Sequence, residues 1–228
     1  MRVSAFSESA RGVAVAIVVI FAGASAGAQD HDAQIWLTGS TKISLDDKWS
    51  MSGEVNVRFN NLTDRLGQTQ LKLNLVRDIG AGVSLTAGYG HMISHNENMP
   101  DRHENRLWQA IGWEFLKTDN YAFATRTQLE ERFINGDAGW RLRQRISLKR
   151  TISKKMYVYG SGEGYFFLND TRWGAQSGFE QLRIGAGLGV HLRDGMALET
   201  GYLNRLKIVR DAEDEMSHII GVTLKFRP

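Results

Sequence analysis

The sequence of 228 residues contains no cysteine and only two prolines. Without cysteine the chain can form no disulfide framework, no thiolate nucleophile and no cysteine-ligated metal site. Glycine, in contrast, is abundant, with 24 residues. This composition suits strands and turns better than a bundle of helices.

Long apolar runs are absent after the first 28 residues. The apolar run 12–24 (GVAVAIVVIFAGA) follows Arg2 and Arg11 and precedes Ala26-Gly27-Ala28. A basic start, a short apolar run and a small-x-small site are typical of a secretory signal peptide. The run is too short to cross a bilayer as a helix. We therefore predict a signal peptide over 1–28 and one domain over 29–228.

A strong charge of one sign is also lacking. The formal net charge is +3, and loss of Arg2, Arg11 and Glu8 with the signal peptide lowers it to +2. A nearly neutral mature chain gives no indication of a nucleic-acid partner. We predict neither a nucleic-acid partner nor a cofactor.

The remaining chain alternates apolar and polar residues from end to end. In WRLRQRISLKR (140–150), Leu142, Ile146 and Leu148 alternate with basic residues, which is the period-two pattern of a strand with two different faces. We predict eleven strands of roughly ten to fourteen residues, longer than the five or six residues usual in soluble sheets. Their ranges are 34–45, 48–59, 68–77, 82–93, 105–116, 120–133, 138–150, 155–168, 178–192, 195–209 and 217–227.

The predicted connections are of two kinds. Short turns alternate with longer polar loops, which we place at 60–67, 94–105, 134–139, 169–178 and 210–217. Tight turns on one rim and longer loops on the other are typical of outer-membrane barrels. Because such barrels normally have an even number of strands, we expect ten or twelve, and we favour twelve.

Alternation alone does not say which face meets water. A soluble, lipocalin-like periplasmic barrel places the apolar face inside, and a membrane barrel places it outside. The export signal, the strand lengths, the unequal connections and the apolar closing strand 217–227 favour the membrane barrel. We predict an all-β, antiparallel, up-and-down transmembrane barrel of the bacterial outer membrane. Its predicted partners are outer-membrane lipid and, through strand 217–227, the barrel-assembly machinery.

Several segments resemble a known family. They are IWLTGSTKISLDDKWSMSGEVNVRFN, RLWQAIGWEF, RTQLEERFINGDAGWRLRQRISLKR and RIGAGLGVHLRDGMALETGYL. The chain is similar over residues 30–228 to the bacterial outer-membrane domain-of-unknown-function 2490 family. The resemblance implies an outer-membrane β-barrel and brings no catalytic residues.

Charged residues on the predicted inner face are the candidate functional residues. Acids and bases facing each other in a narrow lumen should pair, because an unpaired buried charge is costly. One interpretation is a salt-bridged, largely plugged interior, and the other is a narrow pore whose cations favour small anions. The candidates for this lumen network and pore lining are Arg58, Glu54, Arg126, Glu130, Arg132, Arg141, Arg143, Arg145, Lys149, Glu163, Arg183, Glu199 and Arg205.

Tyrosines and glycines alternate on two neighbouring predicted strands. Tyr157, Tyr159 and Tyr165 share a face on 155–168, and the glycines at 185, 187 and 189 share a face on 178–192. The rings could lie over a glycine floor, or the glycines could permit strong coiling of the strand.

The segment 91–104 is the candidate for enzymatic chemistry, since it combines Ser94, three histidines and several acids. His91 and Ser94 are three residues apart and face opposite sides of a strand, so they are poorly placed as a nucleophile and base. His91, His95 and His103 could hold a metal, but a polar loop supplies such groups without purpose in most cases.

We therefore expect a structural or narrow passive-channel barrel, without a catalytic or metal site that the sequence can demonstrate. The alternatives are a lipid-modifying enzyme with a rim site near 91–104 and a soluble lipocalin-like binding protein.

Overall fold

The chain forms a β-barrel in the computed structural model, which describes residues 30–210 and 212–228. The predicted signal peptide over 1–28 lies outside these residues. The predicted all-β barrel is confirmed, and each predicted strand range overlaps an observed strand. Among the described residues, no helix is long and apolar enough to cross a membrane. The strands are β1 (Asp30–Ser44), β2 (Trp49–Asn60), β3 (Arg65–Gly80), β4 (Val83–Ser94), β5 (Arg102–Lys117), β6 (Tyr121–Ile134), β7 (Asp137–Thr151), β8 (Met156–Phe167), β9 (Gly178–Arg193), β10 (Met196–Lys207) and β11 (Glu215–Phe226).

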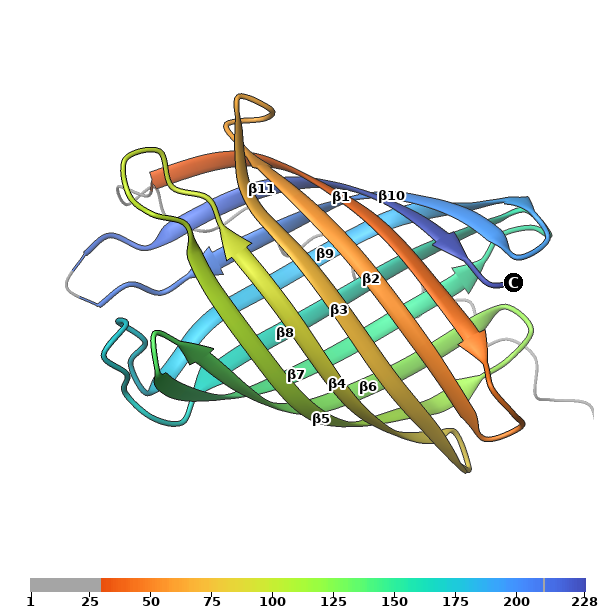
Figure 1. Cartoon of the computed structure of the whole chain (residues 1–228). Helices are drawn as coiled ribbons and strands as arrows, with labels where there is room; N and C mark the ends of the chain where they lie inside the picture. The colour runs from red at the N-terminus through yellow and green to blue at the C-terminus, as the bar shows by residue number, and fades with distance from the viewer. Residues whose placement is uncertain (1–29, 211) are drawn as a thin grey trace, which may run out of the picture.

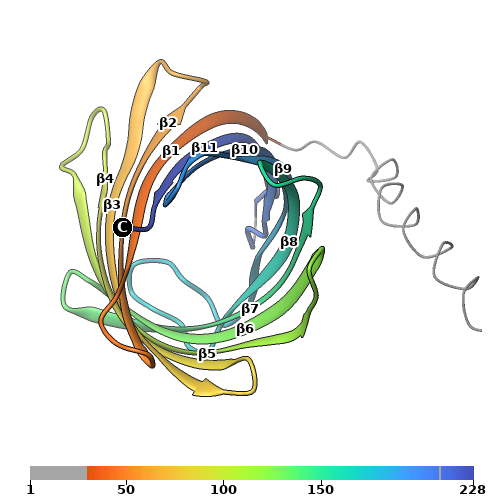
Figure 2. The ribbon, with the colours of Figure 1, turned by 90° about the vertical axis from the view of Figure 1, so that its right-hand side faces the viewer.

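Each strand pairs with its neighbours in sequence, and the ring closes between β1 and β11. The strands run obliquely to the barrel axis (Figure 1) and surround one lumen when seen end-on (Figure 2). All neighbouring pairs are antiparallel except the closing pair, which is parallel and runs in register from Asp30 with Glu215 to Thr41 with Phe226. Closure leaves no sheet edge with unpaired backbone groups.

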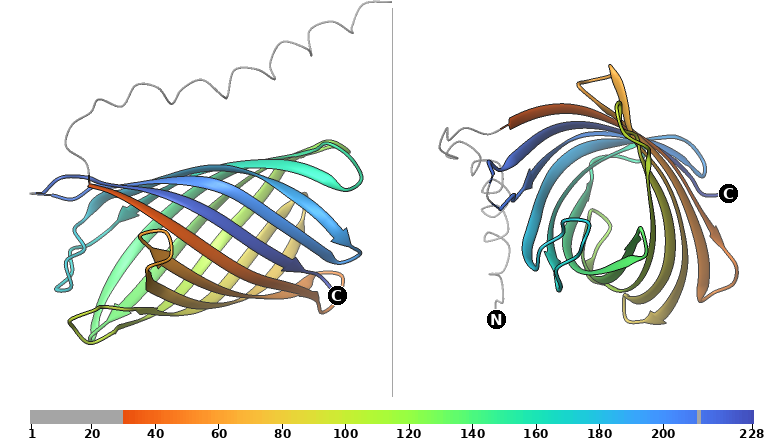
Figure 3. Two further views of the ribbon diagram at one scale, coloured as in Figure 1. Left: turned by 90° about the horizontal axis from the view of Figure 1, so that it is seen from above. Right: turned by 60° about the vertical axis from the view of Figure 1, so that its left-hand side comes forward.

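The expectation of an even number of strands is wrong for the described barrel, which has eleven. Strand direction alternates along the chain, so the first and last of eleven strands point the same way. They can close the ring only as a parallel pair, whose slanted hydrogen bonds are slightly less stable per residue. As a second consequence, β1 begins at one rim and β11 ends at the other (Figures 1 and 3).

The two rims differ, although one predicted loop is wrong. The connection predicted at 134–139 is a two-residue turn, because β6 ends at Ile134 and β7 begins at Asp137. Asn135 and Gly136 both have positive φ, 50° and 74°, which is the geometry of a type I′ hairpin turn. Longer connections at 95–101, 168–177 and 208–214 remain on the same side. We call this side the loop rim and the opposite side the turn rim.

The barrel wall is apolar outside and polar inside. On β3, Leu71, Leu73 and Leu75 point outward with exposed fractions of 42–46%, whereas Gln70, which directly precedes them, is 2% exposed. Glu104, Glu130 and other polar residues are likewise buried within the ring. This arrangement is the reverse of a soluble barrel and is the pattern of a membrane barrel.

Candidate functional site

The lumen contains a cavity of about 350 Å³ whose lining carries more cations than acids. The cavity extends across the inner faces of most strands. Its lining residues are alternate positions along each strand, because every second side chain of a strand points inward. The acids in its lining are Glu54, Glu130, Glu163 and Glu199. The cations are twice as many: Arg58, Lys72, Arg106, Arg126, Arg143, Arg145, Arg183 and Lys225.

Glu130 is the centre of the buried charge network on the wall formed by β5–β8. This carboxylate is 1% exposed. It accepts hydrogen bonds from Arg141 and, at 2.9 Å, from Arg143, and Arg106 Nη1 lies 3.7 Å away. Arg143 continues the network to Glu163, with 2.7 Å between Nη2 and Oε1.

A second buried acid, Glu104, joins two arginines that face each other across β5 and β6. Arg106 and Arg132 are cross-strand partners, and like charges in this position repel each other. Glu104 Oε1 accepts a hydrogen bond from the Nε of each, both at 2.5 Å. The carboxylate therefore offsets the repulsion between the two guanidinium groups.

Loop 168–177 covers this charge network at the loop rim. The Trp173 ring lies 4.8 Å from the Arg132 guanidinium carbon and 5.7 Å from the Phe167 ring. From β9, Glu180 adds an ion pair to Arg141 at 2.9 Å. Next to the wall of β5–β8, paired charges and aromatic rings therefore occupy the loop-rim end of the lumen.

The remaining predicted lumen residues lie closer to the turn rim or along the cavity. Glu54 pairs with Lys72 at 2.7 Å, and Glu199 accepts hydrogen bonds from Lys225 at 2.6 Å and from Tyr157 at 2.8 Å. The predicted carboxylates therefore lie in three separate groups and not in one continuous network. Glu130 and Glu163 belong to the first group, Glu54 to the second and Glu199 to the third. Of the others, Lys149 lies 3.9 Å over the Tyr157 ring, Arg126 is 3.7 Å from Glu163, and Arg145 donates to Ser161 at 3.4 Å.

Four of the predicted arginines have no carboxylate of the described residues within 4 Å: Arg145, Arg58, Arg183 and Arg205. The last three lie on β2, β9 and β10. The guanidinium carbons of Arg58 and Arg183 lie 3.7 and 5.3 Å from the centre of the buried Trp36 ring. Arg183 and Arg205 face each other across β9 and β10. We call these three residues the arginine triplet.

Sequence reasoning missed several members of the site. Arg106, Lys225 and Trp36 lie on inward-facing positions, which the period-two count could have identified on the predicted strands. Glu104 was assigned to a loop because the apolar alternation is interrupted there, whereas β5 begins at Arg102. Glu180 is three residues before Arg183, so strict alternation would place the two side chains on opposite faces of β9. A register shift next to Glu180 changes this alternation, and no local sequence pattern predicts the shift.

Of the two interpretations of the tyrosines and glycines, the glycine floor describes two of the three tyrosines, Tyr157 and Tyr159. A Cβ at residue 189 would overlap the Tyr157 ring, and a Cβ at residue 187 would lie 2.5 Å from the Tyr159 hydroxyl. The third expectation is wrong: Tyr165 lies instead beside arginines, at 4.8 Å from Arg183 and 4.8 Å from Arg143. Its hydroxyl donates to Glu163 at 2.9 Å.

The rim segment 91–104 separates the pair that the sequence suggests. Ser94 faces the lumen and accepts a hydrogen bond from Gln68 at 3.0 Å. His91 faces outward and lies 2.9 Å from Asn105 Oδ1. Within residues 30–210 and 212–228, no three His, Asp or Glu side chains converge as a metal site.

A different set of three side chains is aligned on the outer face of this rim. His95 Nε2 lies 3.2 Å from the Thr69 hydroxyl, and His95 Nδ1 lies 2.8 Å from Asp101 Oδ2. Hydroxyl, imidazole and carboxylate in this order are the arrangement of an acyl-transfer triad. The sequence does not indicate this set, because Thr69 and His95 are 26 residues apart and come together only through the pairing of β3 and β4.

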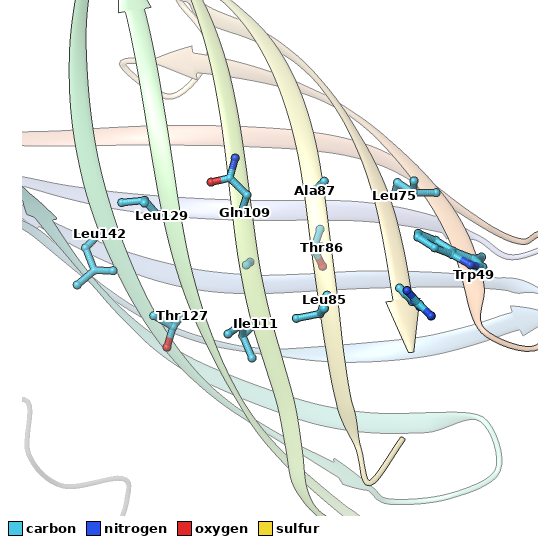
Figure 4. Close-up of a pocket in the computed structure, with 12 residues that line it drawn as sticks. Trp49, Leu75, Leu85, Thr86, Ala87, Gln109, Ile111, Thr127, Leu129 and Leu142 are labelled. Atoms are coloured by element: carbon cyan, nitrogen blue, oxygen red, sulfur yellow. The ribbon is translucent and has the colours of Figure 1, made fainter. Parts of the chain in front are cut away.

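A hollow with a volume of about 560 Å³ lies on the outside of the barrel. Figure 4 shows its apolar side chains in rows across β2–β7, with Leu142, Leu129, Ala87 and Leu75 in one row. It opens on the outer apolar wall, so it is separate from the charged lumen.

Comparisons with known proteins agree with this architecture. The family model described as "Protein of unknown function (DUF2490)" matches residues 33–216, and the chain belongs to this family. An uncharacterized protein of Methylorubrum extorquens (strain AM1) is 28% identical over 217 residues, which cover 92% of this chain and 95% of that protein. A solved NanC porin structure matches with a TM-score of 0.54 and 14% identity, covering 84% of this chain and 97% of that chain. The last match shows a porin-like barrel fold.

Proposed function

We propose that this protein is an outer-membrane barrel that acts as a narrow passive channel for small anions. The observation that carries the proposal is the charge of the lumen cavity, whose lining has eight cations against four acids. Rings of positive side chains attract anions into a pore and repel cations. The low dielectric of a narrow lumen strengthens this effect.

The arrangement of the cavities supports a path along one side of the lumen. At the loop rim, a second cavity of about 250 Å³ is lined by Asp32, Asn60, Arg205 and their neighbours. Towards the turn rim, the main cavity shares Ser40, Glu54 and Lys225 with a third cavity of about 140 Å³. The arginine triplet lies between the main cavity and the loop-rim cavity of about 250 Å³. Arg58 and Arg183 line the main cavity, and Arg205 lines the loop-rim cavity.

The outer-membrane location is supported by the exposed apolar wall and by the porin-like fold. We expect the mature protein to fractionate with outer membranes and to begin at Gln29, after removal of the predicted signal peptide. Mass spectrometry of the protein extracted from purified membranes measures both. Recovery of the protein from the periplasmic fraction would instead support the soluble binding protein.

The channel proposal is tested by single-channel recording of the refolded mature protein in a planar bilayer under a salt gradient. We expect discrete conductance steps and a reversal potential of the sign that anion preference gives. Arg145→Gln, in the lumen, should reduce this preference, whereas Arg150→Gln, an exposed cation at the turn rim, should not. Stable insertion without conductance would refute the channel and favour a plugged, structural barrel.

A second candidate function is ester hydrolysis at the outer face of the loop rim, and the alignment of Thr69, His95 and Asp101 favours it. In this function the Thr69 oxygen attacks the carbonyl of a lipid ester while His95 takes the hydroxyl proton. His95 then returns the proton to the leaving alcohol, and water releases the acyl group from threonine.

Hydrolysis is tested with purified protein in mixed micelles of phospholipid and detergent, by measuring released fatty acid. Thr69→Ala and His95→Ala should each abolish release. Ser94→Ala is the matched control, because Ser94 lies nearby but faces the lumen and should not affect the rate. Release that is absent in the wild type, or unchanged in both variants, would refute the hydrolase.

A further inference from the structure

The arginine triplet is an unneutralised cluster of cations inside the barrel. The charges that act most strongly on Arg58 are those of Arg183, Arg106 and Arg205, all of which are cationic. The facing pair Arg106 and Arg132 shares the carboxylate of Glu104. In the facing pair Arg126 and Arg145, Arg126 has the carboxylate of Glu163 at 3.7 Å. For the facing pair Arg183 and Arg205, no carboxylate in the described part of the chain lies within 4 Å of either guanidinium group.

Three acids act on the triplet from beyond ion-pair distance, and two of them are paired with other cations. Glu163 acts on Arg183 from beyond ion-pair distance, and it pairs with Arg143 at 2.7 Å. Glu215 acts on Arg205 in the same way and pairs with Lys207 at 2.9 Å. The third, Asp32, acts on Arg205 and accepts hydrogen bonds from the Gln34 side chain and the Asn61 N–H. The triplet therefore keeps a net positive charge that these neighbours do not cancel.

Neutral groups satisfy part of the hydrogen-bonding capacity of the triplet. Arg58 donates to Asn56 at 2.6 Å and to Gln68 at 2.8 Å, and Arg205 donates to Ser217 at 2.7 Å. With its amide oxygen turned towards Arg183, Gln181 accepts from Nε at 2.6 Å. These contacts fix the orientation of the guanidinium groups but leave their charge in place, and Arg205 Nε remains buried without a partner.

We propose that the arginine triplet is a binding site for an oxyanion, either a carboxylate or a phosphate. The anion would lie between the main cavity and the loop-rim cavity. Guanidinium groups match the paired oxygens of both anions and form short, charge-assisted hydrogen bonds with them. The buried Trp36 ring supports Arg58 and Arg183, so the cluster is held in place before the anion arrives. A halide offers no paired oxygens, so the site distinguishes oxyanions from chloride.

This inference rests on the proposed channel function and names the class of anion that passes through the channel. Its test measures binding and does not require a conductance measurement. The experiment is isothermal titration of the refolded protein in zwitterionic detergent with inorganic phosphate and, separately, with citrate, both in a chloride buffer. We expect saturable binding of at least one of them. Arg183→Gln and Arg205→Gln should each weaken binding about tenfold or more, the loss expected when one charge-assisted hydrogen bond is removed.

Arg150→Gln is the matched control and should bind as the wild type does. Binding of phosphate alone or of citrate alone would support the site and identify which oxyanion it prefers. The absence of saturable binding, or an equal loss in the control, would overturn the proposal. A protein that binds but does not conduct would refute the channel while retaining the site.

Thermal unfolding supplies a second readout if a variant binds too weakly to titrate. Phosphate should raise the melting temperature of the wild type, because a ligand that binds only the folded state stabilises it. In Arg205→Gln the phosphate-dependent rise should disappear. The phosphate-free melting temperature should rise, because the repulsion from Arg183 is removed. A variant that keeps the full phosphate-dependent rise would contradict the proposed site.

Discussion

Replacement of Glu130 by glutamine is the sharpest test of how the lumen network stabilises the barrel. The substitution keeps the shape of the side chain but removes the charge that faces Arg141, Arg143 and Arg106. Breaking a buried ion pair by neutralising one partner costs about 3–5 kcal/mol. Each of the three arginines keeps one other carboxylate, so we expect the lower end, about 3 kcal/mol.

The free energy of unfolding is measured by urea titration of the protein refolded in detergent, followed by tryptophan fluorescence. With a urea dependence of about 2–3 kcal/mol/M, the expected loss lowers the midpoint by about 1–1.5 M. The control is Glu131→Gln, one residue away on the outer face, where we expect a change of less than about 0.5 kcal/mol. Equal midpoints for the two variants would refute the role of Glu130 as the centre of the network.

Two further predictions concern the packing and the closure of the barrel. Gly189→Ala should destabilise the protein by about 1–3 kcal/mol in the same urea titration, because the new Cβ overlaps the Tyr157 ring; unchanged stability would show that the ring has room to move. For the closure, Leu37→Cys and Val222→Cys face each other in the parallel pair of β1 and β11 and should form a disulfide on oxidation. Leu37→Cys with Leu224→Cys is offset by two residues and should not; cross-linking of the offset pair alone would contradict the parallel register.

The fold was largely predictable because it depends on a pattern that repeats along the whole chain. The alternation in 140–150 assigns Arg141, Arg143 and Arg145 to one face, and all three lie inside the barrel. Strand number was less predictable, since it depends on how β1 meets β11, which are distant in sequence. The parallel closing pair follows from no local signal.

The candidate site was predictable in composition but not in pairing. At the turn after β9, Arg193 pairs with Met196. An unbroken register from this pair would give Leu206 as the cross-strand partner of Arg183. The register shift between Met196 and Ala197 moves that partner by one residue, to Arg205. A bulge of one residue therefore decides whether two cations face each other in the lumen. The same limitation applies to the side chains that cross the lumen, because their contacts depend on rotamers and not on strand positions.

The distribution of charge between the two walls argues against a lumen that serves only as a plug. On the wall of β5–β8, the carboxylate of Glu104 joins two arginines and that of Glu130 joins three, and these groups are buried and paired. A plug requires this arrangement on every wall, because an uncompensated buried charge destabilises the folded barrel. On the wall of β9 and β10, Arg183 and Arg205 face each other, and no carboxylate among residues 30–210 and 212–228 lies within 4 Å of them. Such a cluster costs stability, and this cost supports our proposal that an anion occupies or passes the site.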